Sequence, residues 1–152
     1  MSIKKLIPKF KRVLQLTLSD WRDLGKASAE LLAARIRLST ASPEQILREL
    51  KGESEPSPNK PVDLGAAMVV KRVSRAVTLA ARYVPWRSDC LIQVMAADRW
   101  LRRLNVRGDF HLGVAKDPHG DLRAHAWLRY GDLTVTGGRF DEFSPLIEPS
   151  PK

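Results

Sequence analysis

The sequence predicts an α+β fold in which helices come first along the chain and an antiparallel sheet follows. Apolar residues recur at helical spacing through most of the first 104 residues. The pattern then changes to alternation in three segments, "DFHLGV" (109–114), "LRAHAWLRY" (122–130) and "LTVTG" (133–137). Gly131-Asp132, between the last two, is typical of a two-residue hairpin turn. Helices grouped before a hairpin-connected sheet are the layout of an α+β domain.

Length and composition agree with a single globular domain. The chain has 152 residues, of which 43% are hydrophobic and 28% charged. Its one cysteine excludes an intramolecular disulfide, and its three histidines lack the spacing of a metal site, so we expect no metal and no other cofactor. The net charge of +9 favours an acidic partner. Nucleic acid is not expected, because no nucleic-acid-binding motif is present and the cations are spread along the helices.

The first predicted helix occupies the N-terminal segment, where Pro8 weakens it or confines it to the residues that follow. Its apolar stripe has cations on the other side and comprises Ile3, Leu6, Ile7, Phe10, Val13 and Leu14. We recognise no secretory signal, and Val13–Leu18 is too short and too polar to span a bilayer, so a cytoplasmic location is expected. Residues 1–18 suit either docking on an anionic membrane surface or a partner protein, or packing on the chain's own core.

Three further helices precede the cysteine. Ser19 is a reasonable N-cap for the second, whose predicted apolar stripe is Trp21, Leu24, Leu31, Leu32 and Ile36. The third opens at Ser42-Pro43 and runs to about Leu50. The fourth covers about 62–83, with its apolar face formed by Val69, Val73, Ala76, Val77 and Ala80. Prolines in "KGESEPSPNKP" indicate a linker or mobile loop, which divides the chain into 1–50, 51–61 and 62–152.

Cys90 stands at the beginning of the next predicted helix. Ser88 is a plausible N-cap, which places Asp89 and Cys90 in the first turn. The helix dipole and the unpaired N–H groups favour negative charge there, and the thiolate is the nucleophilic form of cysteine. The neighbouring Asp89 carboxylate opposes a second anion. The residues therefore leave two interpretations open, a nucleophile or a small buried apolar residue.

A cysteine nucleophile needs a base, for which His125 is the best candidate. It lies in the middle of a predicted strand between Ala124 and Ala126, which leave room, and Trp127 on the same face can exclude water. The alternative is a half-buried strand histidine with a structural role. His111 is a weaker candidate on the preceding strand, and His119 in "DPHG" is expected to be a solvated turn residue.

These motifs together resemble a known family. The stretch from "PWRSDCLIQ" through "HLGV" to "AHAWLRYGDLTVTGG" is similar to the transglutaminase-like cysteine peptidases of lasso-peptide biosynthesis, the stand-alone B proteins that remove the leader. The likeness covers roughly residues 62–148, and "LSDWRDLGKASAELLAARIRL" also has the family's character. The resemblance implies a papain/transglutaminase-like core, a nucleophile helix packed on a small antiparallel sheet, with a Cys–His–Asp triad. In it Cys90 matches the nucleophile and His125 the base.

The third triad member is where this sequence departs from the family. The pattern expects an acidic or amide residue about a dozen positions after the histidine, where this chain has no carboxylate in 135–138. Asp132 is excluded because it lies roughly 20 Å along the strand, at about 3.3 Å per residue. A two-residue hairpin places His125 opposite Gly138, which leaves Thr136 and Asp141 as the nearest polar candidates. We favour Asp141, because a carboxylate stabilises the imidazolium better than a hydroxyl does.

The resemblance also implies partners: a ribosomally made precursor peptide, a separate leader-recognition protein, and an ATP-dependent synthetase that closes the macrolactam ring. Two other functions remain open. One is a transglutaminase-like acyltransferase or amidase that uses the same Cys–His pair. The other is a catalytically degenerate scaffold that binds the precursor, an alternative kept open by the missing carboxylate.

Overall fold

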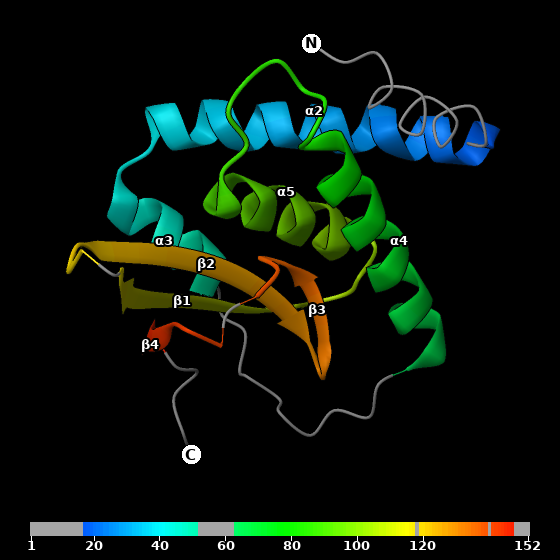
Figure 1. The fold of residues 1–152 in the computed structure, drawn as a ribbon. Helices are drawn as coiled ribbons and strands as arrows, with labels where there is room; N and C mark the ends of the chain where they lie inside the picture. Colours follow the sequence, from blue (N-terminus) through cyan, green and yellow to red (C-terminus); the bar gives the residue numbers. More distant parts are fainter. Residues whose placement is uncertain (1–16, 52–62, 118, 140, 148–152) are drawn as a thin grey trace, which may run out of the picture.

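The computed structural model describes residues 17–51, 63–117, 119–139 and 141–147, and the fold is α+β, as predicted. Its helices are α2 (Leu18–Thr40), α3 (Pro43–Lys51), α4 (Leu64–Ala80) and α5 (Cys90–Arg103). Its strands are β1 (Asp109–Lys116), β2 (Leu122–Tyr130), β3 (Leu133–Thr136) and β4 (Ser144–Ile147). They form one antiparallel sheet in the order β3-β2-β1-β4 (Figure 1).

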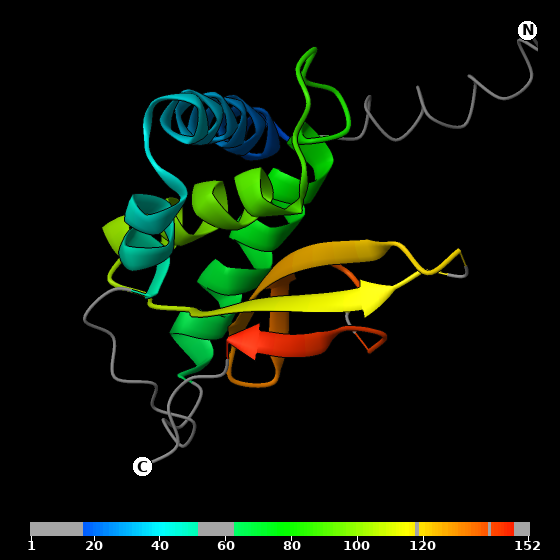
Figure 2. The same cartoon turned by 90° about the vertical axis from the view of Figure 1, so that its left-hand side faces the viewer.

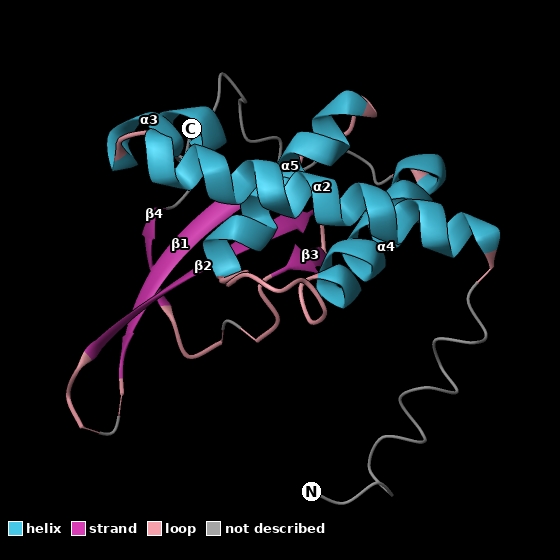
Figure 3. Cartoon of the chain, turned by 90° about the horizontal axis from the view of Figure 1, so that it is seen from above, coloured by secondary structure: helices cyan, strands magenta, loops and turns pink. Residues whose placement is uncertain are grey.

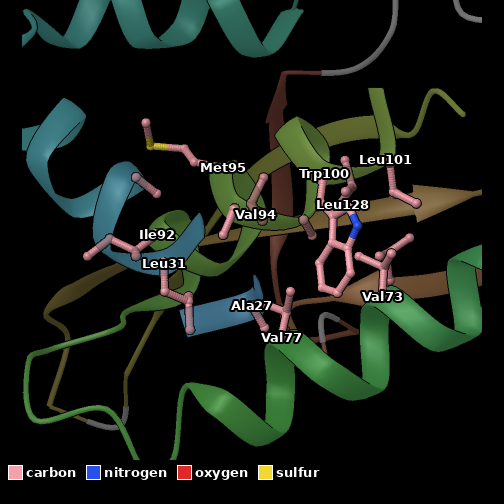
Figure 4. Close-up of a cluster of buried hydrophobic side chains, with 14 of the residues drawn as sticks. Ala27, Leu31, Val73, Val77, Ile92, Val94, Met95, Trp100, Leu101 and Leu128 are labelled. Carbon is pink, nitrogen blue, oxygen red and sulfur yellow. The ribbon is translucent and has the colours of Figure 1, made fainter. Parts of the chain in front are cut away.

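Helix α5 is the centre of the fold. It lies between α2 and the sheet, and α4 crosses beside it (Figures 1 and 2). Most of its length is buried, including Ile92, Val94, Trp100 and Leu101, which pack with residues of α2, α4 and β2 (Figure 4). Each large apolar side chain buried in this way contributes about 1.5–3 kcal/mol. The first residue of α5, Cys90, is therefore held by a helix that is packed on several sides.

The N-cap of α2 lies two residues earlier than predicted. Thr17, not Ser19, is the N-cap: Asp20 N–H donates to Thr17 Oγ1 at 3.3 Å, and Thr17 N–H donates to Asp20 Oδ2 at 2.9 Å. This reciprocal capping box satisfies two donors that a helix end leaves open, which explains why it prevails over a single serine cap.

The predicted apolar stripe of α2 is also largely wrong, because Trp21, Leu32 and Ile36 are exposed. The buried face carries small and acidic residues as well as Leu31. Two of these, Asp23 and Glu30, form ion pairs across the helix layer: Asp23 with Arg72 at 2.5 Å, and Glu30 with Arg103 at 2.5 Å and Arg99 at 3.2 Å. A buried carboxylate is tolerated when it is paired, and a count of apolar residues alone does not detect such a face.

Helices α3 and α4 agree more closely with the sequence. Helix α3 opens at Pro43 as predicted, where Ser42 and Gln45 exchange capping hydrogen bonds of 3.2 and 3.3 Å. Helix α4 is shorter at both ends than the predicted 62–83 and is capped by Asp63. Its buried face includes four of the five predicted residues, with Val70 in place of Val69.

Some predictions concern segments outside the described residues. The first predicted helix, up to Leu16, lies there, as does the predicted linker apart from Lys51, which ends α3. The division into 1–50, 51–61 and 62–152 stays a prediction, although α2 packs in the same core cluster as α4 and α5. Within the part of the chain that the structure describes, no helix is long and apolar enough to cross a membrane.

The three predicted strands are present, and β4 at the edge beside β1 was not predicted. The strands β1 and β2 pair in uninterrupted register from Asp109↔Arg129 to Lys116↔Leu122. Because paired residues share a face, Phe110 and Leu128 lie together on the helix-facing side, while His111 and Trp127 lie on the other. The end of this ribbon where β1 finishes and β2 begins extends beyond the helices (Figure 3).

The β2–β3 hairpin contains a bulge that the sequence did not indicate. The two-residue turn is confirmed, but the pairs run Tyr130↔Leu133, Arg129↔Thr134 and Leu128↔Thr136. Val135 is thus an extra residue, so the predicted pairing of His125 with Gly138 is wrong by one position. Val135 and Thr136 are both buried, although neighbours in a regular strand point to opposite faces. Beyond the bulge, Gly137 lies against Trp127 of β2.

Candidate active site

Cys90 is the first residue of α5, so its predicted place in the first helical turn is confirmed. The N-cap, however, is Asp89 and not Ser88. Ser88 instead contributes its main-chain carbonyl, which accepts a 2.8 Å hydrogen bond from Gln93 Nε2 one turn into the helix. Gln93 N–H also donates to the Asp89 carbonyl at 3.0 Å. These two bonds fix the approach of the chain to Cys90.

The N-cap side chain leaves the beginning of α5 open. Among the described residues, the Asp89 carboxylate makes no capping hydrogen bond, and it lies 3.5 Å from Arg87 on the exposed surface. The N–H groups of the first turn have no acceptor within the helix by construction. A ligand oxygen next to Cys90 can therefore meet free backbone donors at the positive end of the helix dipole.

His125 lies in β2 with its ring half-buried between two aromatic side chains. Phe143 is 4.8 Å away between ring centroids, tilted by 30°, and Trp127 is 6.1 Å away and stacked. The ring nitrogen Nε2 lies 2.5 Å from the carbonyl oxygen of Gly137, just beyond β3. The imidazole is thus held by two rings and one hydrogen bond.

Cys90 and His125 line one cleft, of about 590 Å³. Ser74 and Thr78 of α4, with Ala81 and Arg82 just after its end, form one wall, and the end of β3 forms another. The two residues predicted as nucleophile and base, 35 positions apart in the sequence, are therefore brought to the same site. Their catalytic roles stay predictions.

The two candidates for the third triad member lie in different surroundings. Thr136 is buried at the end of β3 and lines the cleft, and its hydroxyl has no hydrogen-bond partner among the described residues. Asp141 is exposed in the turn that precedes β4. The assignment to Asp141 or Thr136 stays a prediction.

Gly137 and Phe143 both contact His125, and sequence reasoning missed them. The Gly137-Gly138 pair was the available signal for an unusual backbone there.

Gly137 is required by its surroundings, which gives a stability prediction. Its φ is +104°, and a Cβ built on it would lie 2.4 Å from the Cβ of Trp127. We expect Gly137→Ala to lower the free energy of unfolding by more than about 2 kcal/mol, from overpacking and backbone strain together. Gly138→Ala is the matched control, because φ is +60° there and nothing lies within 4 Å of its added Cβ. Denaturant unfolding measures both, and equal losses would contradict the close contact with Trp127.

The other two histidines have separate surroundings. His111 on β1 stacks on Trp127 with ring centroids 5.5 Å apart, so it borders the same aromatic group as His125. Nearby, burial raises the pKa of the Asp109 carboxyl, and the charges of His111 and Arg129 oppose that rise. His119 is exposed in the turn before β2, as predicted. No group of three or more His, Cys, Asp or Glu side chains in the described ranges is arranged to hold a metal ion.

A known family matches the part of the chain that forms the candidate active site. Residues 29–148 match the transglutaminase-like superfamily, a stretch that runs from within α2 to just past β4 and includes both Cys90 and His125. No curated protein and no solved structure gives a significant match to the chain. The fold type is one that cysteine proteases and acyltransferases share. Because the match covers most of its length, the chain belongs to the transglutaminase-like superfamily.

Proposed function

We propose that this protein is a cysteine peptidase that removes the leader from a ribosomally synthesised lasso-peptide precursor. The observation that carries the proposal is the shared cleft, in which Cys90 at a helix N-terminus and His125 on a strand face the same space. The sequence motifs around both residues resemble the leader peptidases of lasso-peptide biosynthesis. Membership of the superfamily supports the reaction class, acyl transfer through a cysteine.

The first half of the proposed reaction forms an acyl-enzyme. His125 accepts the proton of the Cys90 thiol, and the sulfur attacks the carbonyl carbon at the junction of leader and core. The backbone N–H groups at the beginning of α5 stabilise the oxygen as it becomes negative. His125 then gives its proton to the amide nitrogen as the C–N bond breaks. The core peptide leaves with a free amine, and the leader stays on Cys90 as a thioester.

The second half consumes water. His125 takes a proton from a water molecule, whose oxygen attacks the thioester carbonyl, and the sulfur leaves as the thiolate and regains a proton. The products are the leader acid and the core amine. That amine is the nucleophile that a macrolactam ring closure needs. We therefore propose that an ATP-dependent ring-closing synthetase acts next, and that a separate leader-recognition protein presents the precursor to this cleft in the cytoplasm.

The proposal is tested by the masses of the products. The full chain is mixed with a precursor peptide and its leader-recognition protein, and we expect two shorter peptides whose masses sum to the precursor plus one water. An acyltransferase or amidase would instead yield a cross-linked product or release ammonia without shortening the peptide. An intact precursor, bound by a folded protein at every concentration, would indicate the degenerate scaffold.

The basic N-terminal segment, residues 1–18, gives a prediction about docking. We propose that it contacts a partner protein or an anionic membrane surface, because five cations accompany its apolar stripe. The truncation that tests this should end at Leu16, since Thr17 caps α2. We expect the shortened protein to keep its melting transition and to lose cleavage rate mainly at low partner concentration.

Two outcomes would contradict this docking role. A collapsed melting transition would show that the segment packs on the chain's own core. An unchanged cleavage rate at every partner concentration, with and without anionic vesicles, would leave the segment without a part in the reaction. Replacing the cations Lys4, Lys5, Lys9, Lys11 and Arg12 by glutamine, with the apolar residues kept, separates a loss of charge from a loss of packing.

A further inference from the structure

We propose that the main-chain carbonyl of Gly137 takes the place of a triad carboxylate in this protein. In this arrangement it accepts a hydrogen bond from Nε2–H of His125 and leaves Nδ1 as the nitrogen that exchanges protons with Cys90. The inference rests on one part of the proposed function, that His125 is the base. It does not depend on which peptide is cut.

The hydrogen bond itself determines the tautomer. Nε2 of His125 lies 2.5 Å from the oxygen of Gly137. A carbonyl oxygen only accepts hydrogen bonds, so Nε2 must carry the proton. In the neutral ring the lone pair is then on Nδ1. A base that is fixed in one tautomer by its other nitrogen is what a nucleophile–base pair needs.

The position that carries the carbonyl has no room for a carboxylate. The family pattern expects the acid about a dozen residues after the histidine, and the twelfth is Gly137. Any side chain there would begin with a Cβ 2.4 Å from the Cβ of Trp127 and 2.9 Å from the carbonyl oxygen of Ala126. The backbone of Gly137 thus lies so close to Trp127 that no side chain fits there. The acceptor at the His125 ring is the carbonyl oxygen of Gly137 itself.

The other acceptors near His125 are placed differently. The Thr136 hydroxyl is buried without a hydrogen-bond partner among the described residues, so it is not the group that holds the ring. The Asp141 side chain is exposed. The bulge at Val135 shifts the register after it by one position, so Gly137 lies against Trp127, and its carbonyl oxygen accepts from the imidazole two residues away along β2.

Two aromatic side chains complete the orientation. Phe143 and Trp127 lie 4.8 and 6.1 Å from the His125 ring between centroids, and together they restrict its rotation. A neutral carbonyl fixes the tautomer but stabilises the imidazolium less than a carboxylate does. The arrangement therefore orients the base mainly by geometry and only weakly by charge.

The direct test is the tautomer of His125 in the full-length protein. Nitrogen-15 NMR of histidine-labelled protein at a pH where the ring is neutral distinguishes Nε2–H from Nδ1–H, with His125→Gln used to assign the signal. We expect the Nε2–H form and a proximity between that proton and the α-protons of Gly137. An Nδ1–H form, or rapid averaging between the two tautomers, would overturn the proposal.

Two variants test the rival acceptors without any peptide substrate. The rate of alkylation of Cys90 by iodoacetamide, in which the sulfur displaces iodide, serves as the readout. We expect Asp141→Asn and Thr136→Val to alkylate within about threefold of the wild type at pH 6. His125→Ala should alkylate about tenfold more slowly or worse at that pH, because it removes the group that accepts the thiol proton. Thr136→Val should also be no less stable than the wild type, because it removes a buried hydroxyl that has no partner.

A different pattern would refute the carbonyl. If folded Asp141→Asn slows alkylation as much as His125→Ala does and changes the His125 nitrogen signals, Asp141 is the third member. The same result for Thr136→Val would assign Thr136. Failure of the proposed peptidase function is seen separately, as an uncut precursor in the presence of a protein whose His125 still shows the Nε2–H tautomer.

Discussion

Replacing Cys90 by alanine is expected to abolish leader removal while the fold is kept. The thiol is the nucleophile in the proposed reaction, and removing the nucleophile of a catalytic triad costs well over about 10³-fold in rate. The change is small in volume, and Cys90 is only partly buried at the first position of α5, so the loss in stability should be about 1 kcal/mol or less. The measurement is product mass from the precursor, together with the melting temperature of the variant.

Ser88→Ala is the matched control for this substitution, since Ser88 lies two residues away and lines the same cleft. Its hydroxyl makes no hydrogen bond within the described residues, so cleavage should continue at close to the wild-type rate. If Cys90→Ala still releases free leader, the thiol is not the nucleophile and the cysteine-peptidase account is wrong. Because Cys90 is the chain's single cysteine, no second thiol can explain residual activity.

The second large effect is expected at His125. His125→Ala should reduce cleavage by about 10²-fold or more, the usual contribution of a general base, whereas His119→Ala should be nearly silent. The difference is positional: His125 lines the cleft with Cys90, and His119 is exposed in the turn before β2. Rates under saturating precursor, compared with the wild type, measure the effect on the chemical step.

A second variant separates loss of the base from loss of packing at His125. Alanine leaves a gap between Trp127 and Phe143, whereas His125→Gln fills part of it and keeps an amide that can donate to the Gly137 carbonyl. Both variants should lose about 10²-fold or more in cleavage rate, and the glutamine variant should be the more stable of the two. Equal losses in folded His125→Ala and His119→Ala would mean that the base has been assigned to the wrong residue.

The fold class was predictable because apolar residues follow helical spacing in the first part of this chain and strand-like alternation in the last part, with little overlap between the two. Local signals also placed the two-residue turn at Gly131-Asp132 and the start of α3 at Pro43. The face of α2 was not predictable in the same way. Its buried carboxylates are stabilised by arginines of α4 and α5, and such pairing across the fold has no local pattern.

The candidate site was predictable in part for a similar reason. The helix start at Cys90 and the strand at His125 both have local sequence patterns. The resemblance to a family then paired the two residues as nucleophile and base. The acceptor of the His125 ring has no signature, because it is a main-chain carbonyl displaced by one residue at the bulge beside Val135. When candidates for the acceptor of His125 are sought among side chains, the sequence offers only Thr136 and Asp141. A main-chain carbonyl is present at every residue, so the sequence cannot single one out.

The most direct measurement of the central claim is to locate a covalent adduct with a leader peptide. The peptide ends in a chloromethyl ketone in place of the scissile amide, so that attack by a thiolate forms a C–S bond and releases chloride. After incubation with the leader-recognition protein, we expect one adduct per chain, mapped to Cys90 by peptide mass and slowed in His125→Ala. An unmodified chain that still cuts the precursor, or an adduct on any other residue, would contradict the account.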